Sequence, residues 1–155
     1  MADTIGVREA GPADAEEIVR LFTQLGHPQP EGSAASRLAA FYAEGDRVLV
    51  AESSQSTHQR KLLGATTLHI TPEIHRAGPI GRMTAVVVDE PARGRGIGRL
   101  LIAAAEKYFA EHGCAMVEVT SNTKRLDAHR FYEQLGYTGT SFRFAKPLPI
   151  ESKEN

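Results

Sequence analysis

VVVDEPARGRGIGRLL, residues 86–101, carries the strongest structural signal in this chain. Three valines predict a buried strand, and the apolar spacing after residue 96 predicts an amphipathic helix. The turn between them is rich in Gly and Arg. Glycines let backbone N–H groups approach an anion closely, and a helix N-terminus adds free N–H groups and partial positive charge. The segment therefore predicts a binding site for a diphosphate.

The spacing of these glycines excludes two common nucleotide-binding motifs. A G-x-G-x-x-G fingerprint needs a third glycine where Arg99 follows Gly94 and Gly96. A P-loop needs Gly-Lys-Ser/Thr, whereas Gly98 is followed by Arg99. What remains, Arg93-x-x-Gly96-x-Gly98 after a valine-rich strand, resembles the pyrophosphate loop of the GNAT superfamily of acyl-CoA N-acyltransferases. The alternative is an ordinary strand–turn–helix junction with a charged surface.

This resemblance implies that acetyl-CoA is the co-substrate and that no metal is required. The diphosphate would lie on the 93–99 loop, and the pantetheine amides would pair with main-chain groups near Val86 and Val88 if two neighbouring strands splay apart. The expected binding residues are Val86, Val87, Val88, Arg93, Gly94, Arg95, Gly96, Ile97, Gly98, Arg99, Asn122, Arg125 and Ala128.

A second motif lies in the segment SNTKRLDAHRFYEQLGY, residues 121–137. Its Ala-x-x-x-Tyr pattern, followed by Gly and an aromatic residue, is similar to the last helix of the superfamily. The resemblance implies that Tyr132 protonates the leaving thiolate, and the alternative is a core aromatic residue. Arg125 occupies a position where the family often has Asn, and Asn122 is the other candidate to supply the side-chain amide of that Asn. Together with FRFAK at 142–146, the segment looks most like aminoalkylphosphonate and related small-amine N-acetyltransferases.

The expected reaction moves acetyl to a primary amine by direct attack through a tetrahedral intermediate. An amine with a Lys-like pKa of ~10.4 must first lose a proton. Family members often carry Glu near the positions of Thr84 and Ala85, and this chain does not. Glu118, which alternates with Val117 and Val119 on a predicted strand, is the candidate base. An exposed strand Glu, with water acting as the base, is the alternative.

The order of predicted elements indicates an α+β (mixed α/β) fold, with a mostly antiparallel sheet of six to seven strands flanked by helices. It looks like the GNAT order over nearly the whole chain. One domain is expected at 1–148, followed by a flexible tail at 149–155. Strands are expected at 4–8, 47–52, 62–71, 83–88, 116–120, 137–140 and 142–146, and helices from Pro12 to Leu25 and at 33–43, 96–111 and 126–135.

Composition and charge indicate which partners and which cellular location to expect. A formal net charge of −1 indicates neither nucleic acid nor an anionic membrane as a partner, and neither a signal peptide nor a membrane-spanning run is recognisable, so a cytoplasmic location is expected. His69 and His75 match no standard metal-ligand spacing. Exposed sheet edges would allow a homodimer. A protein acetyltransferase acting on Lys or an N-terminus and a non-catalytic acyl-CoA-binding sensor are the alternative functions.

Overall fold

The computed structural model describes residues 2–27, 32–55 and 61–150. The segments that connect predicted elements at 26–32 and 53–61 lie partly outside these residues, as does the end of the predicted tail. The chain forms two compact units, residues 1–122 and 123–155.

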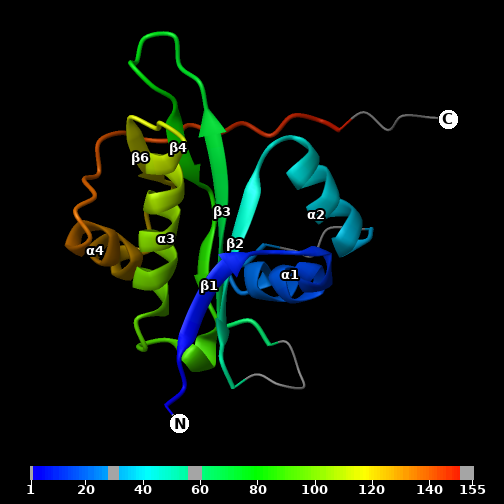
Figure 1. The fold of residues 1–155 in the computed structure, drawn as a ribbon. Helices are drawn as coiled ribbons and strands as arrows, with labels where there is room; N and C mark the ends of the chain where they lie inside the picture. Colours follow the sequence, from blue (N-terminus) through cyan, green and yellow to red (C-terminus); the bar gives the residue numbers. More distant parts are fainter. Residues whose placement is uncertain (1, 28–31, 56–60, 151–155) are drawn as a thin grey trace, which may run out of the picture. The chain divides into compact units, whose positions relative to one another are not determined.

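A six-stranded sheet forms the centre of the first unit (Figure 1). The strands are β1 (Ile5–Glu9), β2 (Arg47–Ser53), β3 (Gly64–Thr71), β4 (Ile80–Met83), β5 (Val86–Val88) and β6 (Met116–Val119). Their order is β1-β2-β3-β4-β6, with β5 also paired to β3. Among the strand pairs of the described residues, only β4 and β6 run parallel. The predicted mixed α/β fold with a mostly antiparallel sheet is confirmed.

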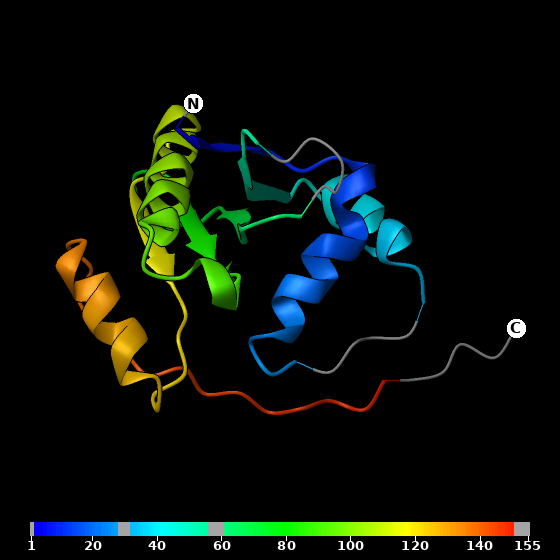
Figure 2. The same ribbon diagram turned by 90° about the horizontal axis from the view of Figure 1, so that it is seen from below.

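Helices cover both faces of this sheet (Figure 2). A 3-10 turn (Pro12–Asp14), α1 (Ala15–Thr23) and α2 (Ala34–Ala43) lie on one face, and α3 (Ile97–Glu111) lies on the other. On the α1 side, Ile18 and Leu21 are buried against Val50 and Val87. Three residues of α2, Leu38, Phe41 and Tyr42, pack against the same core. The first helix ends at Thr23, two residues earlier than predicted.

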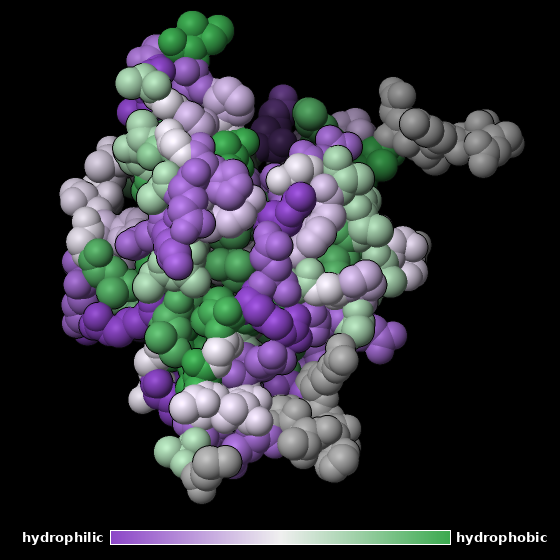
Figure 3. Space-filling view, in the orientation of Figure 1, coloured by the Kyte–Doolittle hydropathy of each residue, from purple (hydrophilic) through white to green (hydrophobic). Residues whose placement is uncertain are grey.

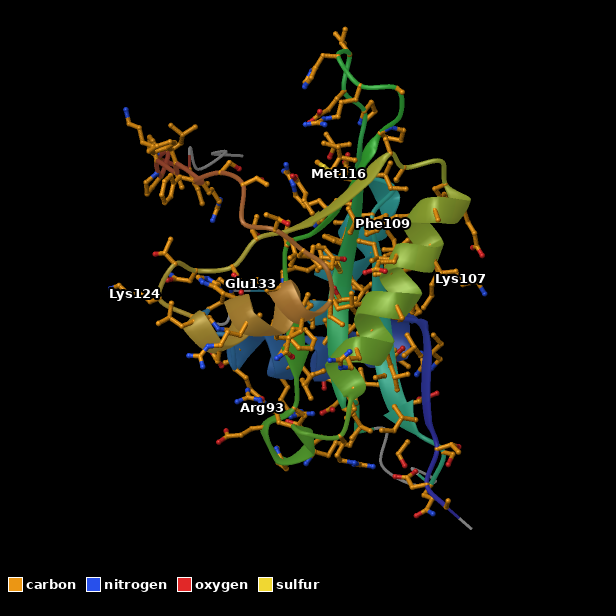
Figure 4. The ribbon with its side chains drawn as sticks, turned by 90° about the vertical axis from the view of Figure 1, so that its left-hand side faces the viewer. Arg93, Lys107, Phe109, Met116, Lys124 and Glu133 are labelled. Carbon is orange, nitrogen blue, oxygen red and sulfur yellow. The ribbon has the colours of Figure 1, made fainter. Side chains whose placement is uncertain are left out.

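The contact between α3 and the sheet shows which strand residues face each side. A Cβ atom added to Gly81 would lie 2.3 Å from Cγ of Phe109, so Gly81 faces α3 at very close range. Figure 4 shows Phe109 on α3. Side chains alternate along a strand, so the neighbouring Arg82 faces the α1 side. The register Arg82↔Glu118 places Glu118 on that side too.

The predicted continuous strand at 83–88 is wrong, because a bulge divides it. β3 pairs with β4 through His69↔Arg82 and with β5 through Thr66↔Val86. Between these pairs, residues 67–68 of β3 lie opposite residues 83–85, so one strand has one extra residue. Such a β-bulge bends the strand. Apolar character alone could not predict it, because Met83 to Val88 is nearly apolar throughout.

The second unit contains α4 (Leu126–Gln134), which ends before Gly136 at φ 92°. The predicted strands at 137–140 and 142–146 are wrong, since residues 137–150 contain no strand. Phe142 and Phe144 alternate with polar residues as in a strand but are 80% and 93% exposed. A strand needs the hydrogen-bonding edge of a partner, which a local pattern cannot supply.

Candidate functional site

An open strand edge begins at the bulge. β4 pairs with β6 as far as Met83↔Val119, whereas β5 pairs only with β3 among the described residues. The carbonyl of Ala85 accepts from the N–H of Thr67 on β3 at 3.1 Å, and the N–H of Asp89 donates to the carbonyl of Leu63, the residue before β3, at 2.8 Å. Antiparallel bonding alternates along the strand, so the N–H and C=O groups of Val86 and Val88 point to the open edge. An extended ligand that carries amides can pair there.

The open edge leads into the predicted anion loop. After a 3-10 turn (Glu90–Ala92), Gly94 and Gly96 adopt φ of 84° and 79°, which side chains disfavour. A Cβ atom added at either position would meet nothing within 4 Å, so the space beside the loop is open. Gly96 is the N-cap of α3 and gives it no side-chain cap. The first N–H groups of α3 therefore remain available to an anion.

The three arginines of the loop have different surroundings, although all are exposed. Nε of Arg93 donates to the Val88 carbonyl at 3.2 Å, so this guanidinium lies beside the open edge (Figure 4). Arg95 pairs with Asp3 at 3.1 Å. Arg99 lies in the first turn of α3. The loop thus concentrates positive charge where backbone N–H groups are free.

A buried carboxylate that the sequence reasoning missed anchors the loop. Asp89 is 2% exposed and accepts hydrogen bonds from Arg20 at 2.9 Å and Gln24 at 2.7 Å. Burial alone would raise the pKa of Asp89, but these bonds outweigh it and hold the pKa below its usual value. The carboxylate of Glu17 accepts hydrogen bonds from both Arg20 and the N–H of Leu62. The polar pair Asp89-Glu90, directly after three valines, is the signal that could have indicated an anchor.

Asp89→Asn is expected to lower the free energy of unfolding by about 2 kcal/mol at pH 7, because bonds to a charged group become neutral ones. The folded pKa of Asp89 is lowered, so its stabilisation is present above the unfolded pKa of about 3.9 and is lost as pH falls through the folded pKa. Urea unfolding should therefore show that the difference in the free energy of unfolding between the parent and Asp89→Asn becomes smaller in acid. The exposed neighbour supplies the control, since Glu90→Gln should change stability by less than about 0.5 kcal/mol. Equal effects of the two variants would contradict the anchoring role.

The candidate base Glu118 is paired with a cation. Its carboxylate bonds to the guanidinium of Arg82 across the β4–β6 pair, on the α1 side of the sheet. Glu73 and His75 lie on the loop between β3 and β4. Glu73 bonds to Arg76 at 2.6 Å and lies 3.3 Å from His75, so these groups bind one another. The tip of this loop is apolar (Figure 3), and Ile74 is fully exposed.

The other predicted residues lie at the boundary between the units and in the second unit. Asn122 is the last residue of the first unit, Arg125 is the N-cap of α4, and Ala128 is half-buried in that helix. Tyr132 stacks edge-on against Phe131 and Tyr137, with ring centroids 5.4 and 6.0 Å apart. Burial raises the pKa of the Tyr132 hydroxyl, which keeps it protonated at neutral pH, as a general acid requires.

An open strand edge that leads into a glycine-rich loop at a helix N-terminus is suited to an extended ligand with an anionic group. Comparison with known families is specific: the chain belongs to the acetyltransferase (GNAT) family, which it matches over residues 15–137. The match includes residues of both units. The predicted superfamily is thereby confirmed.

Individual relatives agree with this assignment. The chain is 41% identical over 88 residues to the aminoalkylphosphonate N-acetyltransferase of Salmonella typhimurium, covering 57% of each protein. It is 36% identical over 78 residues to the glucosamine 6-phosphate N-acetyltransferase of Trypanosoma brucei brucei, covering 50% of this chain and 51% of that one. A solved Trypanosoma brucei acetyltransferase superposes with a TM-score of 0.79 at 27% identity, covering 94% of this chain and 100% of that chain. The chain spans about half the length of the curated relatives it matches.

None of the helices in the described part of the chain has the length and apolar character needed to cross a membrane.

Proposed function

We propose that this protein transfers acetyl from acetyl-CoA to the primary amine of a small molecule. The observation that carries the proposal is the continuity of two features. The open edge of β5 ends at Val88, and the loop with free backbone N–H groups follows within a few residues. Pantetheine amides and a diphosphate occur in this order along coenzyme A, and the edge and loop offer matching groups in the same order.

In this proposal the donor is held mainly by the backbone. Main-chain groups of Val86 and Val88 pair with the pantetheine arm, while N–H groups from Gly96 onward take the diphosphate, with Arg93 and Arg99 adding charge. The bound donor supplies an activated acyl group. In this proposal the N–H of Val86, on the open edge, stabilises the oxyanion. Asn122, Arg125 and Ala128 are further residues proposed to bind the donor, and residues 1–148 are the proposed acetyltransferase domain.

Tyr132 is the proposed acid for the thiolate that leaves, since burial keeps its hydroxyl protonated. Glu118 remains a candidate base, although Arg82 must release it or share it. The proposal needs no covalent enzyme intermediate and no metal. Cys114 is not required either, and burial raises the pKa of its thiol, which makes the thiolate scarcer.

The acceptor is proposed to be a small amine that carries an anionic phosphorus group. Two relatives are named for aminoalkylphosphonate and for glucosamine 6-phosphate, and both names describe an amine of this kind. Arg82, half-buried beside the bulge on the α1 side, is a cation in a suitable position.

Calorimetric titration with acetyl-CoA, followed by a thiol-release assay, tests the proposed function. The assay uses 2-aminoethylphosphonate, glucosamine 6-phosphate, spermidine and a Lys peptide as acceptors. We expect donor binding and fastest turnover of a phosphorus-containing amine. Preference for the peptide would indicate a protein acetyltransferase, and donor binding without any turnover would favour a sensor. Absence of donor binding would contradict the proposal.

A further inference from the structure

A chain of hydrogen bonds runs across the α1 side of the sheet and ends at the bulge. Oδ1 of Asp46 lies 3.1 Å from Nδ1 of His69, and Nε2 of His69 lies 2.9 Å from Oγ1 of Thr84. Thr84 in turn lies 2.9 Å from Oγ1 of Thr67. These residues come from the turn before β2, from β3 and from the bulge between β4 and β5. All four belong to the first unit.

When the imidazole of His69 is neutral, the contacts fit one placement of the protons. An ionised Asp46 can only accept, so Nδ1 of His69 carries the proton and Nε2 presents a lone pair. Thr84 must then donate its hydroxyl proton to Nε2. Oγ1 of Thr67 accepts from the N–H groups of Thr84 and Ala85, at 3.0 and 3.1 Å, so its own proton goes to Thr84. Thr84 is left with one free lone pair on an exposed residue.

The surrounding structure holds this chain in place. The His69 ring stands edge-on to Phe41 of α2, with centroids 5.1 Å apart, and only 23% of its side chain is exposed. Arg82 lies opposite His69 on the neighbouring strand and is paired with Glu118. Asp46 and Arg82 are therefore the charged groups that face the imidazole, one of each sign. The free end of the chain is the Thr84 hydroxyl, next to the point where β4 and β6 stop pairing.

We propose that Thr84 and His69 remove the proton from the acceptor amine, with Asp46 as a positioning residue. This inference rests on the proposed function. It supplies a general base in a chain that has no Glu near Thr84 and Ala85. The ammonium gives a proton to Oγ1 of Thr84 as Thr84 passes its own proton to Nε2 of His69. The neutral nitrogen forms the N–C bond and the C–S bond breaks. The sulfur takes its proton from Tyr132, the proposed acid, the second nitrogen proton restores Tyr132, and His69 returns the first to solvent.

Kinetics of His69→Gln, Thr84→Val and Asp46→Asn test the relay, with the acceptor preferred in the panel above as probe. We expect His69→Gln and Thr84→Val to lower kcat about 100-fold or more, and Asp46→Asn less, with unchanged acetyl-CoA affinity. Higher pH should recover part of the loss, because free amine then forms without a base. Thr84→Ser should restore the rate. His75→Gln, which changes a 76% exposed histidine, is the matched control.

Three results would overturn the relay. Parent-like kcat and pH profile in His69→Gln would remove His69 as proton acceptor. Acetylated Thr84, trapped and located by mass spectrometry, would make Thr84 a nucleophile instead. Nitrogen NMR of the free protein should show the proton of His69 on Nδ1, and a proton on Nε2 in the neutral ring contradicts the chain even if no probe is acetylated. Calorimetry keeps the two proposals apart, since loss of the proposed function appears as absent acetyl-CoA binding in the parent.

Discussion

Gly96→Asp is expected to weaken acetyl-CoA binding about 100-fold or more. The residue caps α3 with φ 79°, and its surroundings are open, so the new carboxylate would occupy the space proposed for the diphosphate. A second negative charge within about 4 Å costs roughly 4 kcal/mol at an effective dielectric constant of 20, and about 1.4 kcal/mol corresponds to tenfold in affinity. Calorimetric titration of the folded variant measures the loss.

Gly96→Asn separates charge from backbone strain in this experiment. Asn has nearly the shape of Asp, carries no charge and is among the side chains that best tolerate positive φ. We expect it to lose no more than about tenfold in affinity. Equal losses in the two variants would attribute the effect to the backbone. Parent-like affinity in Gly96→Asp would show that the loop does not hold the diphosphate.

Tyr132→Phe is expected to lower kcat about 100-fold or more while leaving the affinity for acetyl-CoA within about twofold. The ring contacts with Phe131 and Tyr137 do not need the hydroxyl, so the helix should keep its packing. Only the proton for the leaving thiolate is removed. Steady-state kinetics with the preferred amine, together with calorimetry, measure both quantities.

A second tyrosine provides the control for this variant. Tyr108 lies late in α3, stacked on His112 with ring centroids 4.0 Å apart, and belongs to neither motif. Tyr108→Phe should leave kcat within about twofold. Unchanged turnover in Tyr132→Phe would remove Tyr132 as the acid and favour its role as a core aromatic residue.

The bulge connects the binding and chemical parts of the proposed site. It ends the pairing of β4 with β6, which opens the edge of β5, and it turns Thr84 toward His69. A straight strand from Met83 to Val88 would continue the ladder and leave no edge for a ligand. Bulges are frequent beside active sites for this reason.

The local part of the site could be predicted from sequence. The strand, the glycine turn and the helix after it follow from residues adjacent in the chain, since glycine conformation and helix N-termini are properties of short segments. The apolar stripes of α1 and α2 and the two glycine positions with positive φ in the loop are also properties of short segments. The family resemblance rested on these segments too.

The sequence by itself thus determined the family, the mixed α/β fold and the loop. Only the tertiary structure showed the bulge, the buried anchor Asp89, the pairing of Glu118 with Arg82 and the lack of a strand in residues 137–150. It also joined Asp46, His69 and Thr84, which lie far apart in the chain. The physical reason is that a hydrogen-bond partner or a strand partner is chosen by the packing of distant segments, and no local pattern carries that choice.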